Sequence, residues 1–329
     1  MQKHGIKHHA VTALITDDYF VLDNKAATDV YFTTSMFMDT FMNKKKGLWE
    51  RPEGGEKIRV PLEYDMGEGG FYARGGTISS DDRQTGNAAY FYWKHAYGNA
   101  TIFDEDELKS AGEYAQVQLI VQRVANAQKT ATKKIADQIY NAAADGDAEI
   151  TGLRALTTGS TSTAYAGITP TDLVSTDGTT PWASVNTTTT EGISLAVIRT
   201  LASAAKRYDG PGGKPDYGFT TETLFNIVSG ILQVQQRFQQ DSDTVKAGFT
   251  NLVFEGKIIA ADDYCTSGYL FLVNSKYIGF AIHQNGYFAR TPWADLITAN
   301  VFAKSMKIKW HGNLICSNRK AHTSHSNLS

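Results

Sequence analysis

Side chains that could do chemistry gather in one stretch, KIIAADDYCTSGYLFLVN (257–274). Asp262 and Asp263 are adjacent there, Cys265 follows closely, and His283 lies further along the chain. Carboxylates, thiolates and imidazoles are the groups that bind zinc and that act as general acids and bases. One function to weigh is therefore a metal-dependent hydrolase that uses Asp262, Asp263 and His283.

The local sequence argues against such a site. Adjacent side chains of a strand point to opposite faces, so Asp262 and Asp263 would not share a proton. Cys265 has no partner at a spacing typical of zinc ligands, and the chain has no Gly-x-Ser-x-Gly nucleophile motif. Asp, Ser and Gly are common turn residues. We interpret the stretch as strand, turn and strand, we expect no enzyme, and we assign no catalytic, cofactor-binding or metal-ligating residue.

Two further patterns have weak chemical meaning. The segment DGPGGKP (209–215) resembles a phosphate loop, but Lys214 is followed by Pro215 instead of Ser or Thr, and a helix is expected before it. Histidines cluster near both ends of the sequence, where we expect solvated tails without the fixed geometry that a metal requires. They are His4, His8 and His9, and then His322 and His325.

The composition of the chain argues against two classes of protein, broad nucleic-acid binders and membrane-spanning proteins. The chain has 329 residues and a formal net charge of −2, with 42% hydrophobic and 20% charged residues. Broad nucleic-acid binders are strongly basic, which this chain is not. Its two cysteines fit a reducing compartment. No apolar run approaches the ~18 residues that a membrane span needs, so we expect a soluble chain made in a cytoplasm.

Three elements follow one another in the first half. Residues 27–46 predict one amphipathic helix within an arm. Residues 56–102 read as a long hairpin with alternating apolar positions and a polar, Gly-rich tip. Such a two-stranded ribbon is marginal in water and needs a surface, which a neighbouring subunit could supply. Residues 104–145 predict one helix, about 60 Å long at 1.5 Å per residue, braced against a sheet. Its apolar positions are Leu108, Ala111, Ala115, Ile120, Val124, Ala131, Ile135 and Ile139.

The second half predicts a compact α/β unit. Residues 150–190 are rich in turns, although Trp182 should pack. Thr188 and Glu191 have the spacing of a capping box before a helix. A short strand follows at 215–221, then a helix with a set of apolar core candidates, then several strands. The last residues, RKAHTSHSNLS, should be disordered. The core candidates are Leu224, Phe225, Val228, Leu232 and Phe238.

The order of these parts, with local text, resembles the major capsid proteins of tailed bacteriophages. The matching stretches are ITPTDLVSTDGTTPWASVN (168–186), LQVQQRF (232–238), the run from AGFTNLVFEGK to HQNGYF (247–288) and WHGNLICSNRKAH (310–322). The resemblance extends from about residue 45 onward. It implies that Phe254, Gly256, Asp262, Asp263 and Asn274 are structural.

The resemblance implies an α+β chain with the Hong Kong ninety-seven-like fold. Its domains would be an N-terminal arm (1–50), an extended β-hairpin loop (51–102), a peripheral domain (103–186 and 291–329) with a spine helix (104–145), and an axial domain (187–290). Copies would assemble into hexamers and pentamers that form an icosahedral or prolate shell around phage double-stranded DNA. The chain would be located in the virion, after assembly in the bacterial cytoplasm.

The resemblance also implies partners. Few residues precede the ribbon, so we expect a separate scaffolding protein, with portal and decoration proteins as further candidates. Packaged DNA would contact the inner face of the shell weakly and without sequence specificity. The cations of the spine helix could make such contacts, and the alternative is that they form an ordinary solvated helix face. Some family members cross-link a ribbon lysine to a distant asparagine; Lys57 and Lys94 are present in this ribbon, but no Glu-containing apolar pocket is evident beside either. An encapsulin-type compartment shell, which shares the fold, is the alternative. The helix cations are Arg123, Lys129, Lys133 and Lys134.

Overall fold

The computed structural model describes residues 35–78, 83–109, 113–205, 213–234 and 251–329. The chain divides into two compact units, which we describe separately. Unit 1 comprises His95–Ile135 and Gln284–His311 in its described part. Unit 2 comprises Thr34–Lys94, Ala136–His283 and Gly312–Ser329. The peripheral and axial domain boundaries expected from the resemblance stay predictions.

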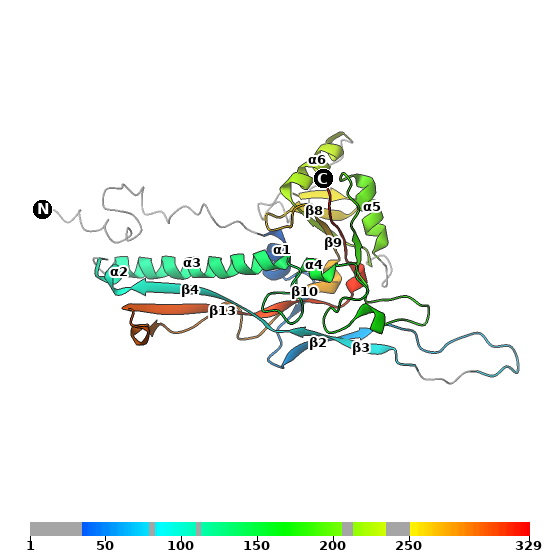
Figure 1. Ribbon diagram of the computed structural model, residues 1–329, viewed down its shortest axis with the longest axis horizontal. Coiled ribbons are helices and arrows are strands. Elements are labelled where there is room, and N and C mark those ends of the chain that lie inside the picture. The colour runs from blue at the N-terminus through cyan, green and yellow to red at the C-terminus, as the bar shows by residue number, and fades with distance from the viewer. Residues whose placement is uncertain (1–34, 79–82, 110–112, 206–212, 235–250) are drawn as a thin grey trace. The chain divides into compact units, whose positions relative to one another are not determined.

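Unit 1 is a helix lying along a sheet (Figure 1). One helix was predicted over 104–145, and most of that range is helical. It forms two helices, and the three residues between them lie outside the described part. The strand β13 is the centre of the sheet, because β4, β11 and β12 all pair with it. The elements are β4 (Lys94–Phe103), α2 (Asp104–Lys109), α3 (Glu113–Ile139), β11 (Ala289–Arg290), β12 (Ala294–Asp295), η5 (Ile297–Ala299) and β13 (Ala303–Cys316).

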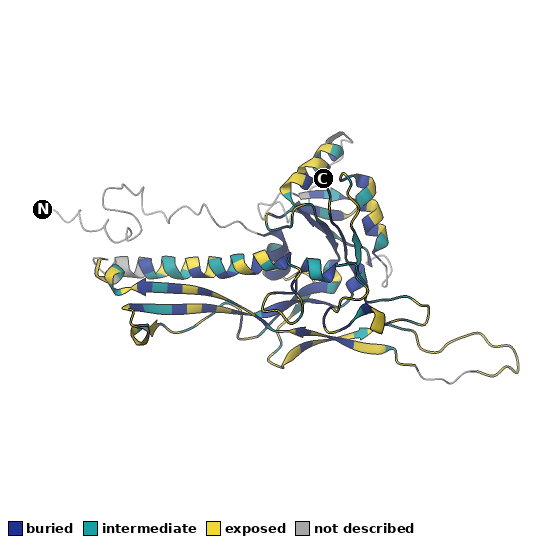
Figure 2. Cartoon of the chain, in the orientation of Figure 1, coloured by how far each residue is buried: buried dark blue, intermediate teal, exposed yellow. Residues whose placement is uncertain are grey.

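Buried and exposed side chains alternate along β4 and β13, and this alternation explains how the helix packs on the sheet. Ala100 of β4 and Ile308 of β13 share a buried cluster with Ala127 of α3. Intervening residues are more exposed, as the alternating colours along both strands in Figure 2 show. Gly98 also faces the helix, because a Cβ there would lie 1.9 Å from the carbonyl oxygen of Ala127. The small residues thus let the helix approach the sheet closely.

Helix α3 ends at Ile139, six residues before the predicted end. The segment that follows, NAAADGD, has good helix formers, but Asn141 and Asp147 compete for its backbone. The Asn141 side chain accepts a hydrogen bond from the Ala142 N–H, and the Asp147 carboxylate accepts one from the Ala144 N–H. Such local side-chain bonds offer the backbone an alternative to the helix.

Unit 2 is built on a six-stranded sheet with the order β5-β14-β9-β6-β8-β7. Strand β14 pairs parallel with β5 and antiparallel with β9, while β6 pairs parallel with β8. The strands are β5 (Val185–Thr187), β6 (Tyr217–Thr220), β7 (Asn251–Phe254), β8 (Lys257–Ala261), β9 (Leu270–Val273) and β14 (Thr323–His325).

Both faces of this sheet are buried. On one face, helices α5 (Leu195–Ala204) and α6 (Glu222–Val234) pack in a cluster that includes Leu270 and Leu272. The cluster confirms four predicted core residues of α6, whereas Phe238 lies outside the described residues. On the other face, the ring of Phe219 lies 5.2 Å from that of Phe37. Burial on both faces explains why β9, with the sequence LFLV, reads as a continuous apolar run.

The first described residues pack within their own unit. Helices α1 (Met36–Met38) and η1 (Asp39–Asn43) replace the single helix predicted over 27–46. Phe37 and Phe41 are fully buried within unit 2 of the same chain. Their aromatic side chains are too large to leave exposed where an apolar sheet face is available. The earlier part of the predicted arm, with His4, His8 and His9, lies outside the described residues.

The prediction of a disordered C-terminal end is wrong. Residues 319–325 form η6 (Arg319–Ala321) and β14, and His322 and His325 are buried. Polar composition suggested a tail, but several of the polar groups here have partners: the Ser324 hydroxyl, for example, donates to the carbonyl oxygen of Thr157. A polar segment can therefore enter a sheet when strand pairing and side-chain bonds satisfy it.

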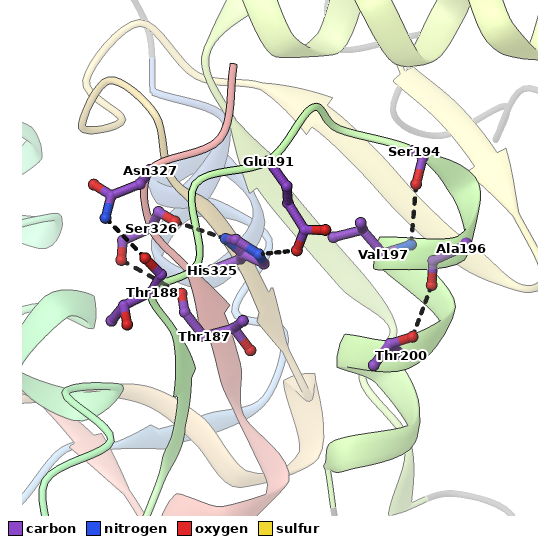
Figure 3. A network of polar contacts seen from close by, with 10 residues as sticks. All are labelled: Thr187, Thr188, Glu191, Ser194, Ala196, Val197, Thr200, His325, Ser326 and Asn327. Carbon is purple, nitrogen blue, oxygen red and sulfur yellow. Dashed lines mark hydrogen bonds and ion pairs between the residues drawn. The ribbon is translucent and has the colours of Figure 1, made fainter.

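The predicted capping box is also wrong. Helix α5 begins after Ser194, whose hydroxyl accepts a hydrogen bond from the Val197 N–H. Glu191 instead lies 2.7 Å from Nε2 of His325, in the polar network of Figure 3. The opposite nitrogen, Nδ1, faces the carbonyl oxygen of Ser326 at 2.7 Å. Glu191 thus fixes the C-terminal strand rather than the helix start.

The hairpin of unit 2 is shorter than predicted. Strands β2 (Lys57–Glu63) and β3 (Gly86–Tyr92) pair antiparallel with Lys57 opposite Tyr92. The chain leaves the hairpin at Trp93 and continues into β4, which pairs with β13 instead. Unit 2 also contains β1 (Leu48–Glu50), parallel to β10 (Ile278–Ile282). The remaining short elements are α4 (Leu153–Leu156), η2 (Pro170–Asp172) and η4 (Ser275–Tyr277).

Candidate assembly surfaces

Asp262 is a buried carboxylate with four hydrogen bonds inside the fold. It is 2% exposed and lies in the turn after β8, where the strand–turn–strand prediction is confirmed. Its Oδ2 accepts hydrogen bonds from the Ser35 hydroxyl at 2.6 Å, the Tyr140 hydroxyl at 2.9 Å and the Phe37 N–H at 3.1 Å. Its Oδ1 accepts from the Tyr264 N–H at 3.1 Å. The carboxylate therefore joins three distant segments of unit 2.

The other acid–base candidates are placed differently. Asp263 is exposed, and His283 is half-buried with its ring 5.6 Å from that of Trp93. Cys265 is a buried free thiol whose pKa is raised well above its ordinary value by burial and by the Asp262 charge. In the described part of the chain, no three His, Cys, Asp or Glu side chains gather as a metal site. None of the helices described there could span a membrane.

A long loop joins β2 to β3, and its outer part is exposed (Figure 2). We call residues 66–78 the loop tip. Its large apolar side chains have little cover from the described residues: Phe71 is fully exposed, and the exposed fractions of the others are 73% for Met66, 69% for Tyr72 and 71% for Ile78. Soluble monomers rarely display such an apolar group on one projection, so the tip marks a contact surface.

The base of this loop is anchored to the loop that precedes β5. The Asp65 carboxylate accepts hydrogen bonds from the Thr176 hydroxyl at 2.7 Å and from its N–H at 3.0 Å. These bonds lower the pKa of the Asp65 carboxyl group. Arg83 lies 2.8 Å from Glu68 across the loop. The polar base is thus positioned, while the apolar tip is presented outward.

A cavity of about 610 Å³ opens beside the loop base, and we call it the base cavity. Aromatic side chains line it, Trp182 and Tyr277 among them, and so do three carboxylates. Trp182 is buried as predicted, and its indole N–H donates to the carbonyl oxygen of Tyr165 at 3.0 Å. The carboxylates are Glu63, Asp65 and Asp177. No periodic pattern predicts this cavity, because its lining comes from the end of β2, from η4 and from loops far apart in the sequence.

Comparison with known proteins tests the fold. No protein-family model and no curated protein matches the sequence. Among solved structures, the capsid asymmetric unit of Cyanophage A-1(L) matches with a TM-score of 0.68 and 15% identity, over 93% of this chain and 96% of that one. The capsid of a native GTA particle matches with a TM-score of 0.60 and 10% identity, over 96% and 98%.

The chain has the Hong Kong ninety-seven-like fold of phage capsid proteins. A chain from Mycobacterium phage Adephagia matches as well, with a TM-score of 0.55 and 12% identity over 98% of both chains. The likeness spans nearly the full length in each case.

The two ribbon lysines, Lys57 and Lys94, differ in burial and in their contacts. Lys94 is 3% exposed, and its ammonium group donates to the carbonyl oxygens of Asp145, at 2.9 Å, and Asp147. Burial lowers the pKa of Lys94. Lys94 therefore holds the turn after α3 and is not presented for cross-linking. Lys57 is at the hairpin surface, with its ammonium group 4.6 Å from the centroid of the Tyr92 ring.

The cations of the spine helix are only partly available for other partners. Arg123 lies 3.5 Å from Asp106 in an ion pair. Lys129 and Lys134 are exposed, while Lys133 is half-buried. The ion pair with Asp106 reduces the positive charge that Arg123 contributes to this helix face. DNA contact by this face stays a prediction.

Unit 1 has exposed apolar side chains of its own. Leu108 of α2 and Val121 of α3 are exposed, and so are Ile297 and Phe302 before β13. The carbonyl oxygen of Phe302 accepts a hydrogen bond from the Asp104 N–H, which places Phe302 near the end of β4. Like the loop tip, these side chains have no cover within the described residues of the unit, and they form a second candidate contact surface.

Proposed function

We propose that this chain is the major capsid protein of a tailed bacteriophage, and that its copies form the hexamers and pentamers of a shell around double-stranded DNA. The fold supports this proposal, and the loop tip is the observation that carries it. Large apolar side chains on a projecting two-stranded ribbon have no folding role in a monomer. Burial against a neighbour removes them from water and orders the ribbon at the same time.

Assembly through the loop tip is compatible with the modest charge of the chain. Each contact involves a few apolar side chains and is weak by itself. A closed shell repeats the contact in every subunit, so weak contacts become a stable assembly. A separate scaffolding protein, a portal and decoration proteins belong to the proposal, as do assembly in the bacterial cytoplasm and weak contact between DNA and the inner face.

The test is electron microscopy and sedimentation of the full-length chain. We expect rings, tubes or shells of many copies. A triple variant with Phe71→Ser, Tyr72→Ser and Ile78→Ser should stay folded by circular dichroism and lose most of its assembly. The matched control with Phe71→Leu, Tyr72→Phe and Ile78→Leu keeps the apolar area and should assemble. A wild-type chain that remains a monomer at high concentration contradicts the proposal.

Two details have separate tests. Uniform closed heads formed without any helper would contradict the separate scaffolding protein. The contents of native particles distinguish the phage shell from an encapsulin-type compartment, because DNA and a portal favour the first and an enclosed enzyme favours the second. The hydrolase alternative requires a free Asp262 carboxylate, whereas that group accepts four hydrogen bonds within the chain.

A further inference from the structure

Two histidine side chains meet on the sheet of unit 1. His95 is the second residue of β4, and His311 lies in β13, the strand with which β4 pairs. Their Nδ1 atoms are 2.6 Å apart, and their ring centroids are 4.7 Å apart with the ring planes at 77°. His95 is exposed and His311 is half-buried. The two imidazoles therefore converge from neighbouring strands at a place that solvent reaches.

The contact between the two rings is a hydrogen bond with a single proton. One Nδ1 donates and the other accepts, because two N–H groups or two lone pairs would repel each other at this distance. The lone pair of a neutral imidazole nitrogen is also the group that binds a transition-metal ion. Once the shared proton has left, the pair has two nitrogen ligands directed at the same point.

The histidine of the C-terminal strand has a different environment. Nε2 of His325 faces the carboxylate of Glu191, and its Nδ1 faces the carbonyl oxygen of Ser326, both at 2.7 Å. Both nitrogens of that buried ring are thus engaged by oxygen atoms of the fold. In the pair of His95 and His311, by contrast, nitrogen faces nitrogen, and the exposed side of the pair is open to water.

The distance between the rings suits a metal ion after a small movement. Zinc binds imidazole nitrogen at about 2.0–2.1 Å, so two nitrogens of a tetrahedral site are about 3.3 Å apart. The pair at 2.6 Å needs to open by about 0.7 Å, which a small rotation of the exposed His95 side chain provides. Water then fills the remaining positions, as it fills the open position of catalytic zinc sites.

We propose that His95 and His311 bind one divalent transition-metal ion such as Zn²⁺ through their Nδ1 atoms. Imidazole suits zinc, copper and nickel, whereas Mg²⁺ and Ca²⁺ prefer oxygen ligands. The ion ties β4 to β13 near the start of β4. Lys307 and Lys309 precede His311 along β13 and are exposed, and their positive charges keep the affinity moderate. The site does not depend on the proposed shell function.

Chemical modification tests the site in the wild-type chain. Diethyl pyrocarbonate acylates accessible imidazole nitrogens, and mass spectrometry of the digested chain locates the modified histidines. A neutral imidazole that binds a metal has no lone pair left, so Zn²⁺ should lower the modification of His95 and His311 together, whereas Mg²⁺ should not. His283, whose ring lies 5.6 Å from that of Trp93, is the internal control and should react equally with and without Zn²⁺.

Substitutions give a second readout, by calorimetric titration of the full-length chain with Zn²⁺. We expect one ion per chain. His95→Gln and His311→Gln should each weaken binding by more than the ~10–100-fold that loss of an outer-shell partner costs, because each removes a ligand. His283→Gln is the matched control and should bind like the parent chain. Every chain in this titration has alanine in place of the three histidines that would compete near the start of the sequence, His4, His8 and His9.

Either readout can overturn the site. Undiminished Zn²⁺ binding by the His95→Gln and His311→Gln chains, both folded by circular dichroism, would contradict it. Unchanged modification of both histidines in the wild-type chain at saturating Zn²⁺ would contradict it as well. Neither readout involves assembly, so failure of the metal site leaves the proposed function intact, and a chain that does not assemble leaves the metal site intact.

Discussion

The hydroxyl group of Tyr140 donates a hydrogen bond of 2.9 Å to the carboxylate of Asp262, a residue 122 positions later in the sequence. Tyr140 follows the end of α3, and Asp262 follows β8. Burial, reinforced by the Asp262 charge, raises the pKa of Tyr140 well above its usual value, so the phenol stays protonated and remains a donor. The residue that first suggested catalysis thus organises the centre of unit 2.

Asp262→Ala should lower the free energy of unfolding by about 3–5 kcal/mol, because it leaves buried donors on Ser35, Phe37 and Tyr140 without their acceptor. Denaturant titration followed by intrinsic fluorescence measures this loss. Asp263→Ala changes the exposed neighbour and should stay within about 0.5 kcal/mol of the wild type. Equal losses in the two variants would show that the Asp262 network has no special role.

His322 should make the fold sensitive to acid. Burial lowers the pKa of His322 from 6.5 to about 3, and Nδ1 accepts a hydrogen bond from the Asn274 N–H. The folded state therefore holds the neutral ring. Its contribution is complete above pH 6.5, where the unfolded chain is neutral too, and is lost progressively as the pH falls from 6.5 towards 3.

The expected size of this effect is about 2 kcal/mol between pH 7 and pH 5, since one pH unit corresponds to about 1.4 kcal/mol. Denaturant titrations at the two pH values measure it. His322→Asn retains an acceptor for the Asn274 N–H and has no titrating ring, so the slope of its stability against pH should be smaller by that amount. Identical slopes in both chains would contradict the prediction.

Arg319 should tolerate neither truncation nor replacement by Lys. Its guanidinium group is buried and donates to the carbonyl oxygens of Leu156 at 2.7 Å and Ala155 at 3.1 Å, and to the Thr158 hydroxyl at 2.9 Å. A lysine keeps the charge but cannot reproduce this planar set of donors. We expect Arg319→Lys to cost about 2–3 kcal/mol, because buried acceptors lose their bonds. Arg290→Lys, at an exposed position, is the control for calorimetry.

Gly98→Ala should separate α3 from β4. The added Cβ would lie 1.9 Å from a backbone oxygen of Ala127, which has no flexible end that could move aside. Overpacking of this kind costs about 1–3 kcal/mol, and hydrogen exchange should rise in His95–Ile135. Gly146→Ala is the matched control, since a Cβ there meets nothing within 4 Å. Wild-type exchange rates in the Gly98 variant would show that unit 1 can repack.

Periodic sequence made the long helix and the main strands predictable. Leu224, Phe225, Val228 and Leu232 recur at helical spacing and are buried as expected in α6. The strand–turn–strand around Asp262 followed from turn chemistry. These signals are local, and they hold because the buried face of an element repeats along its own sequence.

What the sequence did not reveal depends on distant partners. Glu191 has capping-box spacing, but His325 is its partner, and Ser194 caps the helix instead. The C-terminal residues are polar like a disordered tail, but they form a strand because β5 and β9 pair with them on either side. The base cavity has no periodic sequence signal, because its lining residues lie far apart in the chain and mostly in loops.

The position of β14 has a consequence for the timing of synthesis. It fills the middle of its sheet, between β5 and β9, yet the ribosome makes it after every strand it must join. Until it emerges, β5 is cut off from the rest of the sheet and two strand edges stay open. A nascent chain therefore cannot complete this sheet before β14 has left the ribosome.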